Sequence, residues 1–251
     1  MSGGSIHVGI GGWTFEPWRG TFYPPGLPQA RELEHAGRHL TAIEINATFY
    51  RSQSPASFAK WRDAVPDGFV FAVKASRFCT NRKILAEAGE SVAKFTGQGI
   101  VELGDRLGPI LWQFAATKRF DPDDMAAFLA LLPASQDGVP LRHAIEPRHE
   151  SFRDPAFFEM ARKAGVAVVY AASPEYPCFP EQTADFTYAR LQSTREDEAA
   201  GYSAAEIACW ADQARQWAEG ARDVFVFFIA GAKVRNPAAA QALIARLHDT
   251  A

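Results

Sequence analysis

The chain has 251 residues, of which 47% are hydrophobic, and a formal net charge of −3 at pH 7. This length and apolar content suit one domain with a large core, and barrels commonly use about 250 residues. The slightly negative charge argues against a general polyanion-binding protein, although it permits a local basic pocket. No stretch approaches the roughly 20 apolar residues of a membrane span, and the N-terminal residues lack the features of a secretory signal. Three widely spaced cysteines form no C-x-x-C pair, so we expect a reducing, cytoplasmic location.

Short apolar runs rich in Val, Ile and Phe alternate with helix-like segments from one end of the chain to the other. Runs of this kind are typical of parallel strands that are buried on both faces. The predicted strands cover residues 7–11, 42–46, 69–74, 109–113, 143–146, 166–171, 186–191 and 224–229.

Helix start signals precede most of the intervening segments, and several place a proline in the first helical turn. The sixth connection differs, because residues 173–184 contain three prolines and predict a loop. Together these features predict one domain over residues 1–251, a (β/α)8 TIM-type barrel that lacks its sixth helix. An open doubly wound sheet is the alternative, but Trp13 stands where the dinucleotide-binding fingerprint needs its third glycine. The predicted helices begin near Pro28, Pro55, Lys83, Pro122, Pro155, Ala204 and Pro237.

Polar residues occur at the carboxyl ends of five predicted strands, which is where barrels of this type build their active sites. Strand alternation places their side chains inside the barrel, with neighbours such as Ile43 and Ile45 facing the helices. A structural ion network is the alternative, pairing Glu44 with Lys74 and Glu146 with Arg148 or Arg190. The candidate catalytic residues are Glu44, Lys74 and Glu146, and the candidate substrate-binding residues are Trp13, Asn46, Tyr50, Gln113, Arg148 and Arg190.

Aromatic residues crowd the first two connections and suit either a stacking wall or a core beneath a long loop. Lys233 and Arg235 precede the last helix, where they could bind phosphate or simply remain solvated beside an Asn cap. His149 is the one histidine near the predicted mouth and is a weaker acid–base candidate. His35 and His39 are spaced like zinc ligands but lack an acidic partner motif, so no metal site is predicted. The aromatic residues are Trp13, Phe15, Trp18, Phe22, Tyr23, Phe49 and Tyr50.

Several ordered motifs resemble those of the YecE-like family, a domain of unknown function. The first is Gly12-Trp13-Thr14-Phe15 with Trp18-Arg19-Gly20, and the second is Glu44-Ile45-Asn46 with Thr48-Phe49-Tyr50-Arg51. Further matches follow in order over nearly the whole chain, and the resemblance implies a barrel-type fold without an established reaction. These further motifs are Phe71-Ala72-Val73-Lys74, Leu107-Gly108-Pro109-Ile110-Leu111 with Gln113, and Glu146 with Arg148-His149 and Ser151-Phe152.

The chain departs from the family pattern at three places in the predicted mouth. Asn81 and Gln192 stand where relatives often carry histidine, and Ile229 and Ala230 stand where they carry two asparagines. The resemblance therefore implies either a different ligand or a pocket that has lost chemistry.

Three functions fit these features. The first is a cofactor-free, metal-independent enzyme for a small anionic or sugar-like, phosphorylated substrate, in which Lys74 polarises an oxyanion and Glu44 or Glu146 transfers a proton. Arg148 and Arg190 would hold the carboxylate or phosphate of that substrate. The second is a non-catalytic or degenerate barrel that binds a ligand. The third is nucleic-acid binding, which the acidic net charge disfavours.

Overall fold

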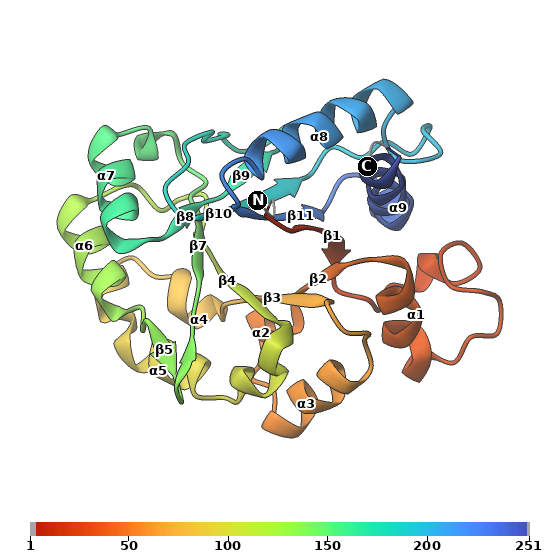
Figure 1. Ribbon diagram of the computed structural model, residues 1–251. Helices are drawn as coiled ribbons and strands as arrows, with labels where there is room; N and C mark the ends of the chain where they lie inside the picture. The colour runs from red at the N-terminus through yellow and green to blue at the C-terminus, as the bar shows by residue number, and fades with distance from the viewer. Residues whose placement is uncertain (1–3, 250–251) are drawn as a thin grey trace.

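The strands form a barrel and the helices pack around its outside, as Figure 1 shows in the computed structural model of this chain, which describes residues 4–249. All neighbouring strands of the barrel are parallel, so the predicted α/β barrel is confirmed. The barrel strands are β1 (Ile6–Gly11), β2 (Ala42–Ile45), β3 (Val70–Lys74), β4 (Leu107–Gln113), β7 (His143–Glu146), β8 (Ala167–Val168), β9 (Tyr170–Ala172), β10 (Phe186–Leu191) and β11 (Asp223–Phe228).

The two ends of the sheet meet at the sixth predicted strand. The strand order is β8-β7-β4-β3-β2-β1-β11-β10-β9, so β8 and β9 are the terminal strands of the sheet. Only Val169 separates them along the chain, and its N–H donates to the carbonyl of Ile145 at 2.9 Å. The barrel is therefore nearly closed at one interrupted segment, whose first half pairs with β7 and whose second half pairs with β10.

Four of the main helices begin at the predicted signals, where side-chain oxygens accept hydrogen bonds from first-turn N–H groups. Ser54, Asp121, Asp154 and Ser203 cap their helices in this way, and Ser203 forms a capping box with Glu206. The main helices are α1 (Glu32–His39), α3 (Pro55–Asp63), α5 (Gly89–Thr96), α6 (Pro122–Leu131), α7 (Pro155–Ala164), α8 (Ala204–Trp217) and α9 (Asn236–His248), and the capped ones are α3, α6, α7 and α8.

Some segments differ from the predicted elements. The helix expected near Pro28 begins only at Glu32, because Pro28 is extended and residues Gln29–Arg31 form a separate 3-10 turn. By contrast, the helical segment at residues 83–103 is divided as its glycines Gly89, Gly97 and Gly99 predict, and Gly99 adopts a left-handed conformation with φ of 104°. Two short helices that directly follow strands, α2 (Ala47–Tyr50) and α4 (Arg77–Thr80), have no sequence signal. A small hairpin pairs β5 (Ser135–Gln136) with β6 (Val139–Pro140).

Strand alternation separates two apolar cores. Residues such as Ile43, Ile45 and Trp112 face the helix layer, whereas Ala72, Ala144 and other interior residues fill the barrel. Larger side chains, including Phe186 at the start of β10, fill the barrel interior near the amino ends of the strands. Residues 173–185, which join β9 to β10, contain no helical turn. Across residues 4–249, no helix combines the length and apolar character that a bilayer-spanning segment requires.

Candidate active site

Arg190 joins two buried carboxylates at the carboxyl end of the barrel interior. Its Nε and Nη2 atoms each lie 3.0 Å from an oxygen of Glu44, and its Nη1 lies 2.5 Å from Oε2 of Glu146. Tyr188, two residues earlier on the same strand, donates its hydroxyl to Oε2 of Glu44 at 2.7 Å. Burial first, and then the charge of Glu44, raises the pKa of Tyr188, which therefore remains a hydrogen-bond donor at neutral pH.

Of the pairings in the ion-network alternative, that of Glu44 with Lys74 is wrong, because Glu44 pairs with Arg190. The alternative paired Glu146 with Arg148 or Arg190, and it pairs with both. A forked guanidinium can bind two carboxylates at once, which a single ammonium group cannot do with the same geometry. Burial alone would raise the pKa of Glu146, but Arg190 and Arg148 outweigh it and lower that pKa. Glu146 is therefore an anion at neutral pH.

Arg148 lies above this network and is held from two sides. Its Nε donates to Oε1 of Glu146 at 2.7 Å, and its guanidinium lies 4.1 Å from the ring centroid of Tyr176. Gln113, at the end of β4, also donates to Glu146 through Nε2 at 3.3 Å. These contacts fix the Arg148 side chain at the edge of the mouth.

Among the described residues, Lys74 is the cation of this cluster that forms no ion pair. It ends β3, is 8% exposed, and its Nζ lies 4.2 Å from the ring centroid of Phe49. Within residues 4–249, its amine takes part in no hydrogen bond or ion pair, even though Glu44 and Glu146 are close enough to interact with it electrostatically. Burial, followed by the charge of Arg190, lowers the pKa of Lys74 to about 8.

A cavity of about 690 Å³ opens above the cluster. Lys74, Gln113, Arg148 and Arg190 lie in its wall, but neither Glu44 nor Glu146 does. Both glutamates are fully buried beneath this cavity. No three His, Cys, Asp or Glu side chains of the described residues gather closely enough to hold a metal ion. The other residues of the wall are Gly11, Gly12, Trp13, Thr14, Gln29, Asn46, Ala47, Tyr50, Arg51, Gln53, Trp61, Gln192, Ile229, Ala230, Lys233 and Asn236.

The aromatic residues of the first two connections do not form one wall. Trp13 and Tyr50 line the cavity, and Trp13 packs edge-on against Trp61 at 5.2 Å between ring centroids. Trp18 and Tyr23 are buried, and the Tyr23 hydroxyl donates to the carbonyl of Trp13 at 2.5 Å. The stacking and core interpretations therefore each apply to part of the set.

The far side of the mouth is built from the ends of β10 and β11. Lys233 lines the cavity, with its Nζ 4.3 Å from the ring centroid of Phe15, whereas Arg235 turns away and donates to the carbonyl of Glu196. Gln192 is 5% exposed, and its Nε2 has no hydrogen-bond partner among residues 4–249. His149 lies outside the mouth cavity, where it contacts Arg119 and Ser151.

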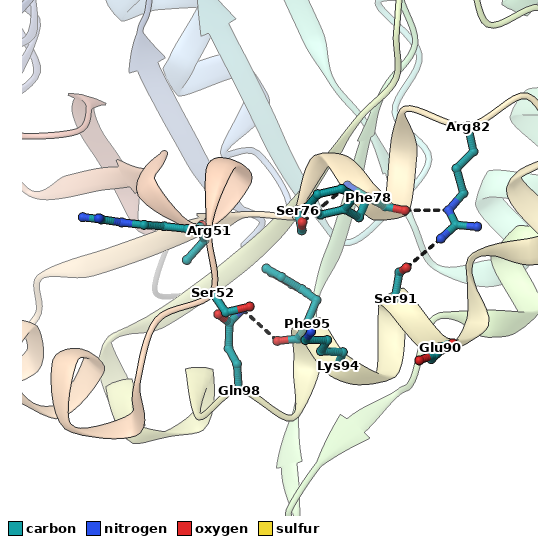
Figure 2. A pocket seen from close by; sticks show the side chains of 11 residues that line it. Arg51, Ser52, Ser76, Phe78, Arg82, Glu90, Ser91, Lys94, Phe95 and Gln98 are labelled. Carbon is teal, nitrogen blue, oxygen red and sulfur yellow. Dashed lines mark hydrogen bonds between the residues drawn. The ribbon is translucent and has the colours of Figure 1, made fainter.

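A second cavity of about 320 Å³ lies beside the mouth, between the segment after α2 and helix α5 (Figure 2). Arg82, one of its cations, is committed to structural contacts: it donates to the carbonyls of Phe78 and Glu87 and to Ser91 Oγ at 2.7 Å. Ser76 Oγ accepts from the N–H of Phe78. Most polar groups here hold loops together, so the mouth is the stronger candidate.

Two contributors to the mouth were missed by sequence reasoning. Phe49 faces the Lys74 amine and Tyr176 supports Arg148. Phe49 was noted only as one of the aromatic residues after the second strand. Tyr176 lies in a proline-rich loop without periodicity, and no sequence signal connects it with the fifth strand.

These features define a parallel α/β barrel of the TIM type with a charged, polar cavity at the carboxyl ends of its strands. The chain belongs to the family described as protein of unknown function DUF72, whose model matches residues 7–251. The resemblance to the YecE-like family is thereby confirmed.

Solved structures of DUF72 family proteins share this fold. The one from Thermotoga maritima has a TM-score of 0.77 and 24% identity, covering 98% of each chain. One from Enterococcus faecalis has a TM-score of 0.72 and 19% identity, covering 98% of this chain and 97% of that one. UPF0759 protein YunF of Bacillus subtilis is 26% identical over 160 residues, which are 61% of this chain. The alignment spans about half of that relative, 54% of its length.

Proposed function

We propose that this protein is a metal-independent enzyme that acts on a small anionic, sugar-like or phosphorylated compound bound in the barrel mouth. Arg148 binds the anionic group, and Lys74 is the catalytic amine that contacts the reacting atoms. The observation that carries the proposal is the unpaired Lys74 amine in a cavity whose other central cation, Arg190, is already neutralised by two carboxylates.

The charges of the mouth support an anionic ligand. Glu44 and Glu146 balance two positive charges, those of Arg190 and Arg148, which leaves Lys74, Lys233 and the exposed Arg51 as excess cations along the cavity wall. In a partly enclosed site of low dielectric constant, such an excess attracts and orients an anion more strongly than it would in water.

The two glutamates receive a different role from the proton transfer expected from sequence. Glu146 is anionic, and its two oxygens accept from Arg190, Arg148 and Gln113. Glu44 accepts from Arg190 and Tyr188. Both carboxylates therefore hold the cations in place beneath the substrate, a positioning role.

Binding of inorganic phosphate and of pyruvate, measured by isothermal titration calorimetry, tests the proposal. Arg148→Met should weaken binding of the anion by about tenfold or more, because a charge-assisted hydrogen bond contributes about 1.5–3 kcal/mol. Arg119→Met is the matched control, since Arg119 is exposed and lies outside the mouth cavity. Equal binding by the wild type and R148M would refute the assignment of this arginine.

Catalysis is tested by following the bound compound by NMR over time. The wild type should convert a true substrate, and Lys74→Met should bind it but leave it unchanged. A ligand that binds tightly and is recovered intact from the wild type would support a non-catalytic, ligand-binding barrel instead.

A further inference from the structure

The amine of Lys74 is placed to act as a nucleophile rather than only as a fixed charge. Its side chain is 92% buried, it faces the Phe49 ring at 4.2 Å, and its Nζ is not paired with a carboxylate of the described residues. Burial and the charge of Arg190 outweigh the opposing charges of Glu44 and Glu146, so this lysine holds its proton weakly. An unprotonated amine can attack electrophilic carbon.

Arg148 presents the complementary binding group. Its Nε donates to Glu146, and the face of its guanidinium stacks on Tyr176. Its two terminal amino groups have no partner in the part of the chain that the structure describes. Those two groups form the fork that matches a carboxylate. Arg148 and Lys74 line the same cavity, and the positive charge of Arg148 acts on the Lys74 amine.

We propose that the substrate is a small carbonyl acid, a 2-oxo acid or an aldehyde acid, and that Lys74 forms an imine with its carbonyl carbon while Arg148 binds its carboxylate. This inference rests on the proposed function and names the substrate class and the covalent step.

Imine formation by Lys74 requires no oxidant or reductant. The lone pair of Nζ forms a bond to the carbonyl carbon, one proton moves from nitrogen to the carbonyl oxygen, a second proton comes to that oxygen from solvent, and the oxygen leaves as water. The remaining nitrogen proton stays on the imine, and hydrolysis later returns the solvent proton. The resulting protonated imine draws electrons from the adjacent carbon atoms, and hydrolysis with one water molecule returns the free amine. Substrate and water are the only reactants.

The lowered pKa of Lys74, about 8, supports this chemistry. At pH 7.5 about a quarter of such amines are unprotonated, against about one in a thousand for an amine with an ordinary pKa of 10.5. Burial also lowers the pKa of Lys233 in the same cavity, but its Nζ lies over the Phe15 and Trp18 rings on the far side of the mouth.

Reductive trapping with glyoxylate and cyanoborohydride tests the inference on the full chain. Glyoxylate is the smallest anionic aldehyde acid, so steric exclusion cannot explain a failure to react. Peptide mapping by mass spectrometry should find Lys74 alkylated at least about tenfold faster at pH 7.5 than the exposed Lys60 and Lys83. Labelling of Lys74 at the rate of the exposed lysines, or faster labelling of Lys233, would overturn it.

Variants separate this inference from the proposed function. Arg148→Met should slow the trapping of Lys74 by about tenfold, and Arg119→Met should leave it unchanged. Anion binding that depends on Arg148, with no preferential trapping of Lys74, would overturn the imine and leave the proposed anion site intact. Loss of both Arg148-dependent binding and preferential trapping would refute the proposed function as well.

Discussion

Lys74 combines burial with an uncompensated positive charge, and this has a consequence for stability. Its pKa falls from 10.5 to about 8 on folding, so the unfolded chain binds the proton more tightly than the folded chain. The free-energy cost of burying the charged Lys74 amine is therefore complete below pH 8 and diminishes as the pH rises toward 10.5.

Replacing Lys74 by methionine should stabilise the protein at pH 7, by at most about 3 kcal/mol, because an apolar side chain of similar length removes the buried charge. The gain in the free energy of unfolding should become smaller between pH 8 and pH 10. Urea unfolding at several pH values measures this difference. Lys60→Met on the exposed face of α3 is the control, and a K74M variant that is less stable at pH 7 would contradict the prediction.

At the level of single residues, strand parity was sufficient to predict which side chains point into the barrel, but not that Glu44 and Glu146 lie buried beneath the mouth cavity. Lys74 follows Ala72 in phase, and Glu44 lies between the outward-facing Ile43 and Ile45. Parity carries no information about partners across the barrel. Glu44 pairs with Arg190 because of the length of both side chains and the spacing of β2 and β10. That spacing is determined only by the assembled barrel.

Among the elements, the loop between β9 and β10 contributes directly to the site. Tyr176 stacks on the Arg148 guanidinium, whose other contact comes from Glu146 at the end of β7. The prolines of residues 173–185 indicated a loop but not its path over the mouth. A loop of this kind lacks the periodicity that makes strands and helices predictable.

Tyr176→Ala should weaken the binding of small anions by about two- to fivefold, since a cation–π contact of a partly exposed arginine contributes about 0.5–1 kcal/mol. Tyr176→Phe retains the ring and should bind like the wild type. Calorimetric titration with pyruvate distinguishes the two variants. Equal affinities of Y176A and Y176F would show that the loop does not hold Arg148 for binding.

At the scale of the whole molecule, the buried ion network links strands that are far apart in the ring. Glu44 on β2, Glu146 on β7 and Arg190 on β10 meet beneath the mouth. The network therefore connects both halves of the chain. The loss of one carboxylate would leave part of the positive charge of Arg190 buried without compensation, which is costly in the barrel interior.

Glu146→Gln should therefore destabilise the whole barrel at pH 7 by about 3–5 kcal/mol. The folded-state pKa of Glu146 is lowered, so its contribution is complete above its ordinary pKa of 4.5 and is lost as the pH falls through the lower folded value. The difference between the wild type and E146Q should thus be constant near neutrality and decrease in acid, as measured by urea unfolding from pH 7 to pH 3. Glu150→Gln, which breaks an exposed pair with Arg153, should change stability by less than about 1 kcal/mol at any of these pH values. If E146Q and E150Q have equal effects, the network does not stabilise the closed barrel.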